Sequence, residues 1–296
     1  MRKNKIYPIL FTFLLTSFTG YVLLDTFVIS EVYEKVEDTS QNESSNEISI
    51  GQTTIDNDTY IDDNISIKLN TIRKYDTTIY IADIYINDAN YLKTAFANSS
   101  YGKNITATTS ETAKNNNAIL AINGDYYGVQ NNGYVLKNYK LYRSTSVSNK
   151  QDLVIYGDGS FEVINESEVT AEQLVKKGAK EILSFGPALI VNGQIVVSEN
   201  EEVGKAMASN PRTAIGIIDK NHYVFVVSDG RTSESVGLSL YELASVMKEI
   251  GIQTLYNLDG GGSSAMYFNG NLINKPTTNG RSIKEREVSD IVYIGY

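Results

Sequence analysis

The chain has 296 residues, no cysteine, one histidine and a formal net charge of −9 at pH 7. Without cysteine it has no disulfide, no thiolate metal ligand and no cysteine nucleophile, and any serine–histidine site would depend on His222 alone. Its acidic field opposes binding to nucleic acid, and its hydrophobic content of 42% supports a folded core.

A membrane signal opens the chain. Three basic residues lie among the first five, and residues 6–24 then carry no charge. At about 1.5 Å per residue this run nearly crosses a hydrocarbon core of roughly 30 Å, and the basic flank should stay in the cytoplasm. The run is long for a cleaved signal peptide. Residues 1–28 therefore predict an uncleaved signal anchor of a single-pass membrane protein, with the remainder extracellular; secretion after cleavage is the alternative.

Residues 29–64 are rich in Glu, Asp, Asn, Ser and Thr and contain few apolar side chains. Such a composition cannot bury enough apolar surface to fold, so this segment is predicted to be a disordered acidic tether that holds the domain off the membrane. The pattern changes near residue 65, which predicts one folded domain over residues 65–296.

Runs of β-branched and aromatic residues, separated by turn residues, predict strands in this domain. The predicted strands cover residues 78–86, 118–122, 135–142, 152–156, 161–164, 214–218, 222–228 and 254–258, with a hairpin over 185–197. Helices are predicted over 88–96, over 111–115 and after the capping boxes that begin at Thr170 and Ser239. The predicted fold class is α/β, in the α+β sense, with a mixed β-sheet core and a few flanking helices.

Three of these strands run into an acidic residue within a glycine-containing turn. The acids are Asp125, Asp229 and Asp259, and three glycines follow the last of them. Glycine lets the backbone approach a ligand closely, and consecutive N–H groups of such a turn can bind an anion. Strand, helix and strand over residues 222–258 predict a crossover between parallel strands. Asp229 and Asp259 should therefore share the carboxyl end of the sheet, where ligands of open α/β sheets bind.

Two arginines complete the predicted site: Arg212 precedes the strand over 214–218, and Arg231 follows Asp229 by two residues. A guanidinium fits phosphate oxygens in bidentate fashion, N–H groups take up charge on a leaving oxygen, and a carboxylate can attack, accept a proton or stabilise a sugar cation. The predicted catalytic residues are Asp125, Asp229, Asp259, Arg212 and Arg231, and the predicted substrate-binding residues are Asn123, Gly124, Ser228, Gly230, Gly260, Gly261, Gly262 and Ser263. His222 begins its strand, so we place it outside this site.

Seven short stretches, taken in order, carry a family resemblance. They are residues 121–127, 185–187, 210–216, 228–231, 237–244, 258–266 and 288–294. In these stretches the chain resembles the phosphodiester glycosidase family over residues 65–296. That family includes a lysosomal enzyme that removes N-acetylglucosamine from a phosphodiester-linked mannose marker, and bacterial proteins labelled as exopolysaccharide-biosynthesis proteins. The disulfides of the animal members are missing here.

The resemblance implies hydrolysis of the bond between a sugar anomeric carbon and a phosphate, in a sugar-1-phosphodiester of a cell-surface or wall polysaccharide. The leaving phosphate monoester is a weak base, so arginines and N–H groups could stabilise it without protonation. Either Asp259 or Asp125 would supply the carboxylate at the sugar, and Asp229 would orient an arginine or bind sugar hydroxyls. Asn123 and Ser263 would be hydrogen-bond partners. No cofactor is implied, and a divalent cation between the acids is the less favoured arrangement.

Two other functions fit the same residues. One is a surface module that binds a phosphodiester-containing glycan without cleaving it. The other is a metal-dependent phosphodiesterase that cuts the P–O bond rather than the C–O bond. The sequence does not predict an oligomeric state, the natural sugar, or retention against inversion at the anomeric carbon.

Overall fold

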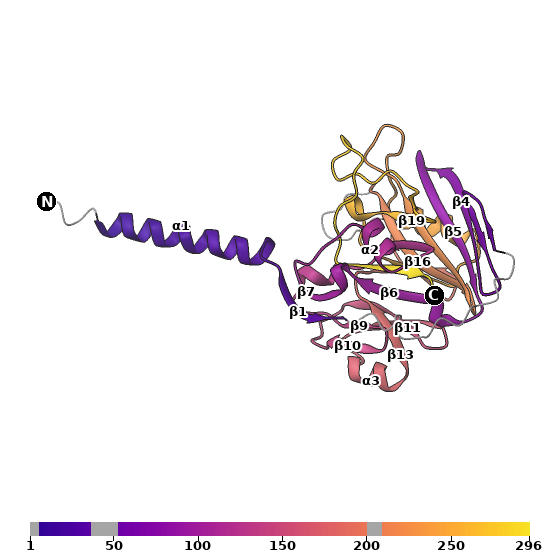
Figure 1. Cartoon of the computed structure of the whole chain (residues 1–296), viewed down its shortest axis with the longest axis horizontal. Helices are drawn as coiled ribbons and strands as arrows, with labels where there is room; N and C mark the ends of the chain where they lie inside the picture. The colour runs from indigo at the N-terminus through magenta and orange to yellow at the C-terminus, as the bar shows by residue number, and fades with distance from the viewer. Residues whose placement is uncertain (1–5, 37–52, 200–208) are drawn as a thin grey trace.

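The computed structural model describes residues 6–36, 53–199 and 209–296 of the chain. Figure 1 shows a body built mainly of β-sheets, from which helix α1 (Ile6–Phe27) projects. No residue of α1 is buried, and the helix is long and apolar enough to cross a membrane. It contains the whole apolar span predicted over residues 6–24.

The largest sheet has nine strands in the order β15-β14-β18-β16-β17-β5-β4-β3-β2. In chain order they are β2 (Thr54–Ile55), β3 (Thr59–Ile61), β4 (Ile65–Lys74), β5 (Thr77–Ile86), β14 (Ala188–Val191), β15 (Gln194–Ile195), β16 (Arg212–Asp219), β17 (His222–Ser228) and β18 (Thr254–Asn257). Neighbouring strands of this sheet pair antiparallel.

Two five-stranded sheets and one two-stranded sheet complete the body. The first has the order β10 (Lys140–Arg143), β9 (Val135–Lys137), β13 (Ala179–Leu183), β11 (Gln151–Tyr156) and β12 (Phe161–Asn165). The second has the order β20 (Asn271–Leu272), β19 (Met266–Phe268), β8 (Leu120–Asn123), β21 (Asp290–Ile294) and β6 (Leu92–Phe96). The two-stranded sheet pairs β1 (Glu31–Lys35) with β7 (Ser100–Lys103).

Few helices flank these sheets. They are α2 (Thr109–Asn115), α3 (Ala171–Lys176), α4 (Leu240–Lys248) and the short 3₁₀ helices η3 (Ala89–Tyr91), η4 (Ala97–Ser99), η5 (Tyr127–Val129) and η6 (Gly261–Ser263). The capping boxes predicted at Thr170 and Ser239 are present at the starts of α3 and α4. Strand content with a few flanking helices confirms the predicted fold class.

The core lies on both faces of the nine-stranded sheet, because alternate residues of each strand point to opposite faces. On one face, Leu240, Leu243 and Met247 of α4 pack in a buried cluster with Ile79 and Val226. On the other face the sheet packs against the two five-stranded sheets, in a cluster that includes Ile84, Phe225, Tyr256, Ile122, Ile155 and Val292. The layers are thus helix, large sheet, and smaller sheets.

Strands β17 and β18 run in the same direction, because each pairs antiparallel with β16, which lies between them. Helix α4 connects them, as the strand–helix–strand pattern predicts, although they are not direct neighbours. The sequence order therefore places Asp229 and Asp259 at the same end of the sheet, one strand apart.

Two of the predicted elements have a different structure, and strands such as β4 and β13 have no predicted counterpart. The helix predicted over residues 88–96 is one 3₁₀ turn, η3, followed by strand β6, because Leu92, Thr94 and Phe96 alternate inward and pair with β21. The single strand predicted over 135–142 is a hairpin of β9 and β10, which turns at Asn138 and Tyr139 with φ of 48° and 67°.

The tether predicted over residues 29–64 also needs correction. Residues 31–35 form β1, and residues 54–55 and 59–61 form β2 and β3 at the edge of the large sheet. Backbone hydrogen bonds hold β1 against β7 and β3 against β4. Such pairing cannot be predicted from the polar side-chain composition of the segment. Residues 37–52 lie outside the described residues.

Candidate active site

Asn123, the last residue of β8, joins two of the predicted site loops. Its Nδ2 donates to the carbonyl oxygen of Asp259 at 2.6 Å, and its Oδ1 accepts from Thr213 Oγ1 at 2.8 Å and from Ala265 N at 3.2 Å. Asp259 N also donates to Gly124 O at 3.3 Å. The loops after β8 and β18, which come from two different sheets, are therefore held side by side.

Asp259 is 9% exposed, the largest fraction among the three predicted acids. Its Oδ2 accepts from Ser263 Oγ at 2.5 Å and from Arg286 Nη2 at 2.9 Å. Arg286 Nε also donates to Ser263 Oγ at 2.8 Å, so the three side chains form a closed group. Burial raises the pKa of the Asp259 carboxyl above its ordinary value, although Arg286 and Ser263 act in the opposite direction.

The glycine loop after Asp259 folds as η6, with Gly261 at φ 61°. The sequence predicts N–H groups on open display here, but three of them donate to backbone carbonyl oxygens: Gly261 N to Pro211 O at 2.8 Å, Ser263 N to Gly260 O at 3.2 Å and Ser264 N to Gly261 O at 3.2 Å. A Cβ on Gly262 would lie 2.3 Å from Thr278 Oγ1. The loop is therefore glycine-rich because neighbouring chain packs against it.

Arg231 lies on the loop after β17, packs against the glycine loop and is also held by its neighbours. Its Nε and Nη2 donate to Asn210 Oδ1 at 3.2 and 3.0 Å, and its Nη1 donates to Thr278 O at 2.6 Å. A Cβ on Gly261 would be 2.8 Å from Arg231 Nη2, so this guanidinium covers the glycine. Burial, together with the nearby charge of Arg286, lowers the pKa of Arg231.

Arg212 is 3% exposed and holds the chain segments around Ser228 and Leu238 in place. Its backbone N donates to Ser228 Oγ at 3.0 Å, and its Nε donates to Leu238 O at 2.8 Å. A Cβ on Gly230 would lie 2.6 Å from Pro211 N, so Gly230 also packs against this segment. The contacts of Arg212, Ser228 and Gly230 therefore hold the loops around the candidate site in place.

Asp229 accepts three hydrogen bonds. Its Oδ1 accepts from Lys275 N at 2.8 Å and from Asn274 Nδ2 at 3.3 Å, and its Oδ2 accepts from Tyr80 OH at 3.1 Å. Asn274 in turn donates to Ser264 O at 2.9 Å, on the loop that follows Asp259. Asp229 therefore anchors the segment that closes over the glycine loop.

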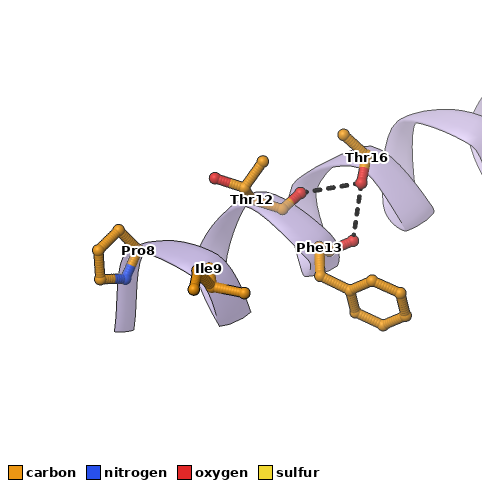
Figure 2. A pocket seen from close by; sticks show the side chains of 5 residues that line it. All are labelled: Pro8, Ile9, Thr12, Phe13 and Thr16. Carbon is orange, nitrogen blue, oxygen red and sulfur yellow. Dashed lines mark hydrogen bonds between the residues drawn. The ribbon is translucent and has the colours of Figure 1, made fainter. Parts of the chain in front are cut away.

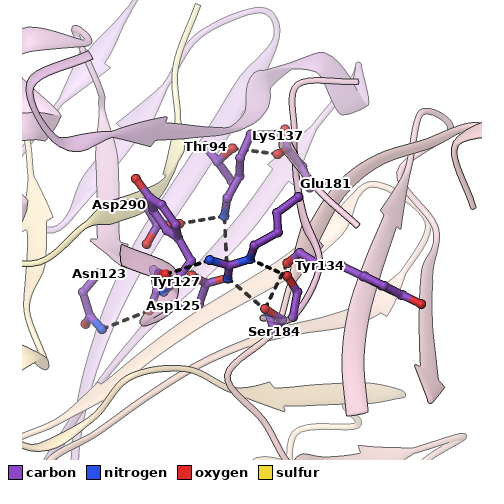
Figure 3. Close-up of polar contacts among 12 residues, drawn as sticks. Thr94, Asn123, Asp125, Tyr127, Tyr134, Lys137, Glu181, Ser184 and Asp290 are labelled. Atoms are coloured by element: carbon purple, nitrogen blue, oxygen red, sulfur yellow. Dashed lines mark hydrogen bonds and ion pairs between the residues drawn. The ribbon is translucent and has the colours of Figure 1, made fainter. Parts of the chain in front are cut away.

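Asp125 belongs to a buried charged cluster, which Figure 3 shows. Its Oδ1 accepts from Tyr127 N and its Oδ2 from Ser184 N, both at 3.1 Å. Lys137 Nζ lies 3.8 Å from Asp125 Oδ2 and 2.6 Å from Asp290 Oδ2. Figure 3 shows Lys137 reaching between the two acids.

The charges of this cluster are almost wholly removed from water, since Asp125, Lys137 and Asp290 are 2%, 3% and 0% exposed. Although burial acts to lower it, the carboxylates of Asp290 and Asp125 hold the pKa of Lys137 above its ordinary value. Burial, together with the charge of Asp125, raises the pKa of Asp290 to about 7, while Lys137 acts to lower it. The cluster thus fixes the position of Asp125 relative to strands β9 and β21.

Gly124 is required by this packing: a Cβ there would lie 2.4 Å from Asp290 Oδ1. We expect Gly124→Ala to lower the free energy of unfolding by about 1–3 kcal/mol, the usual range for overpacking. Gly20→Ala in α1 is the comparison, because a Cβ there meets nothing within 4 Å and its φ is not in the left-handed region. Urea unfolding followed by circular dichroism measures both. Equal losses for the two variants would contradict the close contact.

Three site residues escaped the sequence reasoning: Arg286, Lys137 and Asp290. Asp290 lies in the stretch 288–294, whose only signal in the sequence is the family resemblance. The other two carry no local signal, since each is an ordinary charged residue that reaches the site from a distant part of the chain. His222 lies outside the site as predicted, with its Nε2 at 2.6 Å from Asp83 Oδ1.

No group of three or more His, Cys, Asp or Glu side chains that could hold a metal ion is found in residues 6–36, 53–199 and 209–296. The absence of a cofactor remains a prediction. Figure 2 shows a shallow hollow on the surface of α1, lined by Pro8, Ile9, Thr12, Phe13 and Thr16. It contains no titratable group, so we assign no chemistry to it.

A protein-family model described as phosphodiester glycosidase matches residues 116–295. The SPbeta prophage-derived uncharacterized protein YomE of Bacillus subtilis is 30% identical over 191 residues, which cover 62% of this chain and 29% of that protein. The N-acetylglucosamine-1-phosphodiester alpha-N-acetylglucosaminidase of Bos taurus is 29% identical over 190 residues, which cover 58% of this chain and 35% of that enzyme. The match thus spans about a third of each curated relative.

Two solved structures share the fold. The catalytic domain of the zebrafish N-acetylglucosamine-1-phosphodiester alpha-N-acetylglucosaminidase, auto-inhibited by its pro-peptide, superposes with a TM-score of 0.62 and 19% identity, covering 91% of this chain and 89% of that one. A hypothetical protein from Synechocystis superposes with a TM-score of 0.57 and 14% identity, covering 79% of this chain and 62% of that one.

Proposed function

This chain belongs to the phosphodiester glycosidase family, and on that premise we propose that it hydrolyses the bond between the anomeric carbon of a sugar and the phosphate of a sugar-1-phosphodiester. The observation that carries the proposal is the group of Asp259, Ser263 and Arg286, with the guanidinium of Arg231 against Gly261 of the glycine loop. It offers one carboxylate to a sugar carbon and two guanidiniums to a phosphate.

Asp259 is the acid that we assign to the sugar. Of the three predicted acids it is the most exposed, and its carboxylate lies beside the partly exposed guanidinium of Arg286. Asp229 is occupied by three donors and Asp125 faces the buried cluster, so both suit positioning better than contact with the reacting carbon.

Arg231 and Arg286 are the groups that we assign to the phosphate. The guanidinium of Arg231 packs against Gly261 and that of Arg286 donates to Ser263, two residues along the same loop, so a phosphate bound to both would relieve the repulsion between their charges. A guanidinium has five N–H donors, and the hydrogen bonds described above use only part of those of Arg231 and Arg286, so each retains N–H groups for a phosphate oxygen. Because Arg286 also binds Asp259, it sets the phosphate and the carboxylate next to each other.

The reaction balances with water as the only co-substrate. The C–O bond at the anomeric carbon breaks, its electron pair stays on the phosphate oxygen, and a hydroxyl from water takes its place on the sugar. The proton released from water passes to a carboxylate and then to solvent. The arginines stabilise the negative charge that develops on the leaving phosphate, so that it departs without protonation.

Oxygen-18 water tests the bond that breaks. We propose an aryl phosphodiester of N-acetylglucosamine as the probe, because the matched mammalian relatives are named for that linkage. Cleavage at carbon places the heavy oxygen in the released sugar. Heavy oxygen in the phosphate would indicate a phosphodiesterase instead, and binding without any turnover would indicate a glycan-binding module.

Arg286→Ala is expected to lower kcat/KM for this probe by about 10²–10³-fold, as removal of one charge-stabilising donor does in other enzymes. Arg286→Lys keeps the charge but not the fork, and we expect an intermediate loss. Arg281→Ala, an exposed arginine of the same segment, is the matched control and should stay within twofold. An Arg286→Ala enzyme as active as this control would remove Arg286 from the site.

We further propose that the protein acts outside the cell while anchored by α1, on a cell-surface or wall glycan. The basic residues before the apolar run and the span-length helix support this orientation. Protease protection of α1 with digestion of the domain in intact cells tests it.

A further inference from the structure

Helix α1 is joined to the domain by contacts as well as by the chain. Asn104 Nδ2 donates to Thr26 O in the last turn of the helix at 3.2 Å and to Ile29 O at 3.0 Å. Ser30 Oγ donates back to Asn104 O at 2.8 Å, and Lys103 Nζ lies 4.0 Å from Asp25 Oδ2. The end of the helix is therefore held by the residues that follow β7.

Strand β1 continues this attachment immediately. It pairs antiparallel with β7, from Glu31 opposite Lys103 to Lys35 opposite Ser100. A Cβ on Gly102 would lie 2.0 Å from Glu31 O, so only glycine permits this close approach. Tyr33 packs edge-on against Tyr101 with ring centroids 5.8 Å apart. The segment is thus part of the folded domain.

The link between helix and strand is short. Three residues separate Phe27 from Glu31, and at roughly 3.3–3.6 Å per residue they span at most about 14 Å. Because the net charge of the chain is −9, attraction to anionic lipid would not hold the domain near a bilayer. The short covalent link and the contacts of β1 would do so.

The candidate active site lies next to the same edge. Asn104 N donates to Gly128 O at 3.0 Å, three residues after Asp125. Thr106 Oγ1 donates to Glu287 Oε2 at 2.8 Å, and Glu287 follows Arg286 directly. A path through Asn104, Ile105, Thr106 and Glu287 thus links the end of α1 to Arg286.

We propose that residues 25–36 form a membrane clamp that holds the domain against the outer face of the bilayer, so that the site acts on glycan phosphodiesters attached to that membrane through a lipid. The part about substrate rests on the proposed function; the clamp itself does not. Figure 1 shows β1 and β7 on the side of the body from which α1 leaves, and β4 and β5 on the opposite side.

Lipid quenching tests the clamp without any turnover. The natural chain has no cysteine, so one fluorophore can be attached at Val32→Cys on β1 or at Tyr75→Cys in the β4–β5 turn, both exposed positions. The full-length chain is placed in nanodiscs that contain lipid with a nitroxide headgroup. We expect at least threefold stronger quenching at position 32 than at position 75. Insertion of twelve Gly and Ser residues between Ile29 and Ser30 should remove most of that difference.

Equal quenching at the two positions, or no effect of the insertion, would overturn the clamp. So would mass spectrometry of the cell-expressed protein that shows loss of residues 1–28 by cleavage.

The substrate part is tested with two probes in the same nanodiscs: an N-acetylglucosamine-1-phosphodiester of a lipid and the soluble aryl phosphodiester. The insertion should lower kcat/KM for the lipid probe at least tenfold and leave the soluble probe within twofold. Equal changes for both probes would overturn the preference for membrane-attached substrate. If the wild-type chain turns over neither probe, the proposed function fails, while the quenching result still decides the clamp.

Discussion

Asp259→Asn is expected to lower kcat for a sugar-1-phosphodiester by about 10³-fold. The amide keeps the shape of the side chain and can still accept from Ser263 and Arg286, whose bonds to Asp259 are 2.5 and 2.9 Å long. It cannot attack a sugar carbon, accept a proton from water or stabilise a sugar cation, and loss of such a group removes about 10²–10⁴ in rate. Steady-state kinetics with the aryl phosphodiester measure the change.

Two variants make this result interpretable. Asp63→Asn, an exposed aspartate in the turn between β3 and β4, should keep wild-type kcat. Asp125→Asn tests the other acid that the sequence offered for the sugar. If Asp259→Asn retains a tenth of the activity while Asp125→Asn loses a thousandfold, the carboxylate at the sugar is Asp125 and our assignment is wrong.

Lys137→Met is expected to lower the free energy of unfolding by about 3–5 kcal/mol, the usual effect of removing one partner from a buried ion pair. Methionine fills the space but leaves Asp125 and Asp290 facing each other without the cation that lies 3.8 and 2.6 Å from them. Chemical unfolding of the full-length chain in detergent measures the loss. Lys180→Met is the matched control, because Lys180 is also buried but its Nζ donates to two backbone carbonyl oxygens.

The loss in Lys137→Met should grow as pH rises. In the wild-type fold the pKa of Asp290 is raised to about 7, so its contribution to stability is fully present below its ordinary pKa near 4 and is lost as pH rises through 7. Without Lys137 the pKa of Asp290 rises further, and ionisation opposes folding more strongly at pH 8 than at pH 5. A difference from wild type that is the same at both pH values would show that Asp290 does not respond to Lys137.

Most of the information that the sequence holds about the candidate site lies in the acidic residues at the ends of its predicted strands. Asp229 and Asp259 could be placed together because a strand, a capped helix and a strand in a short stretch imply strands of one direction. That inference does not depend on which strand lies between them, so it holds although β16 separates β17 from β18 in the sheet. The helix predicted over 88–96 failed because its apolar residues match either period, and pairing with β21 decided for a strand.

Local pattern by itself determined the apolar N-terminal helix, the strand-rich fold class, the capped helices α3 and α4, and the acids and glycines that we assign to the candidate site. These features depend on residues a few positions apart, where spacing and backbone conformation are visible in the chain. Only the tertiary structure decided that Arg286 binds Asp259, that Lys137 and Asp290 face Asp125, and that β1 docks on β7. Each of those contacts joins residues far apart in sequence, and their meeting is set by how the sheets pack around the shared core.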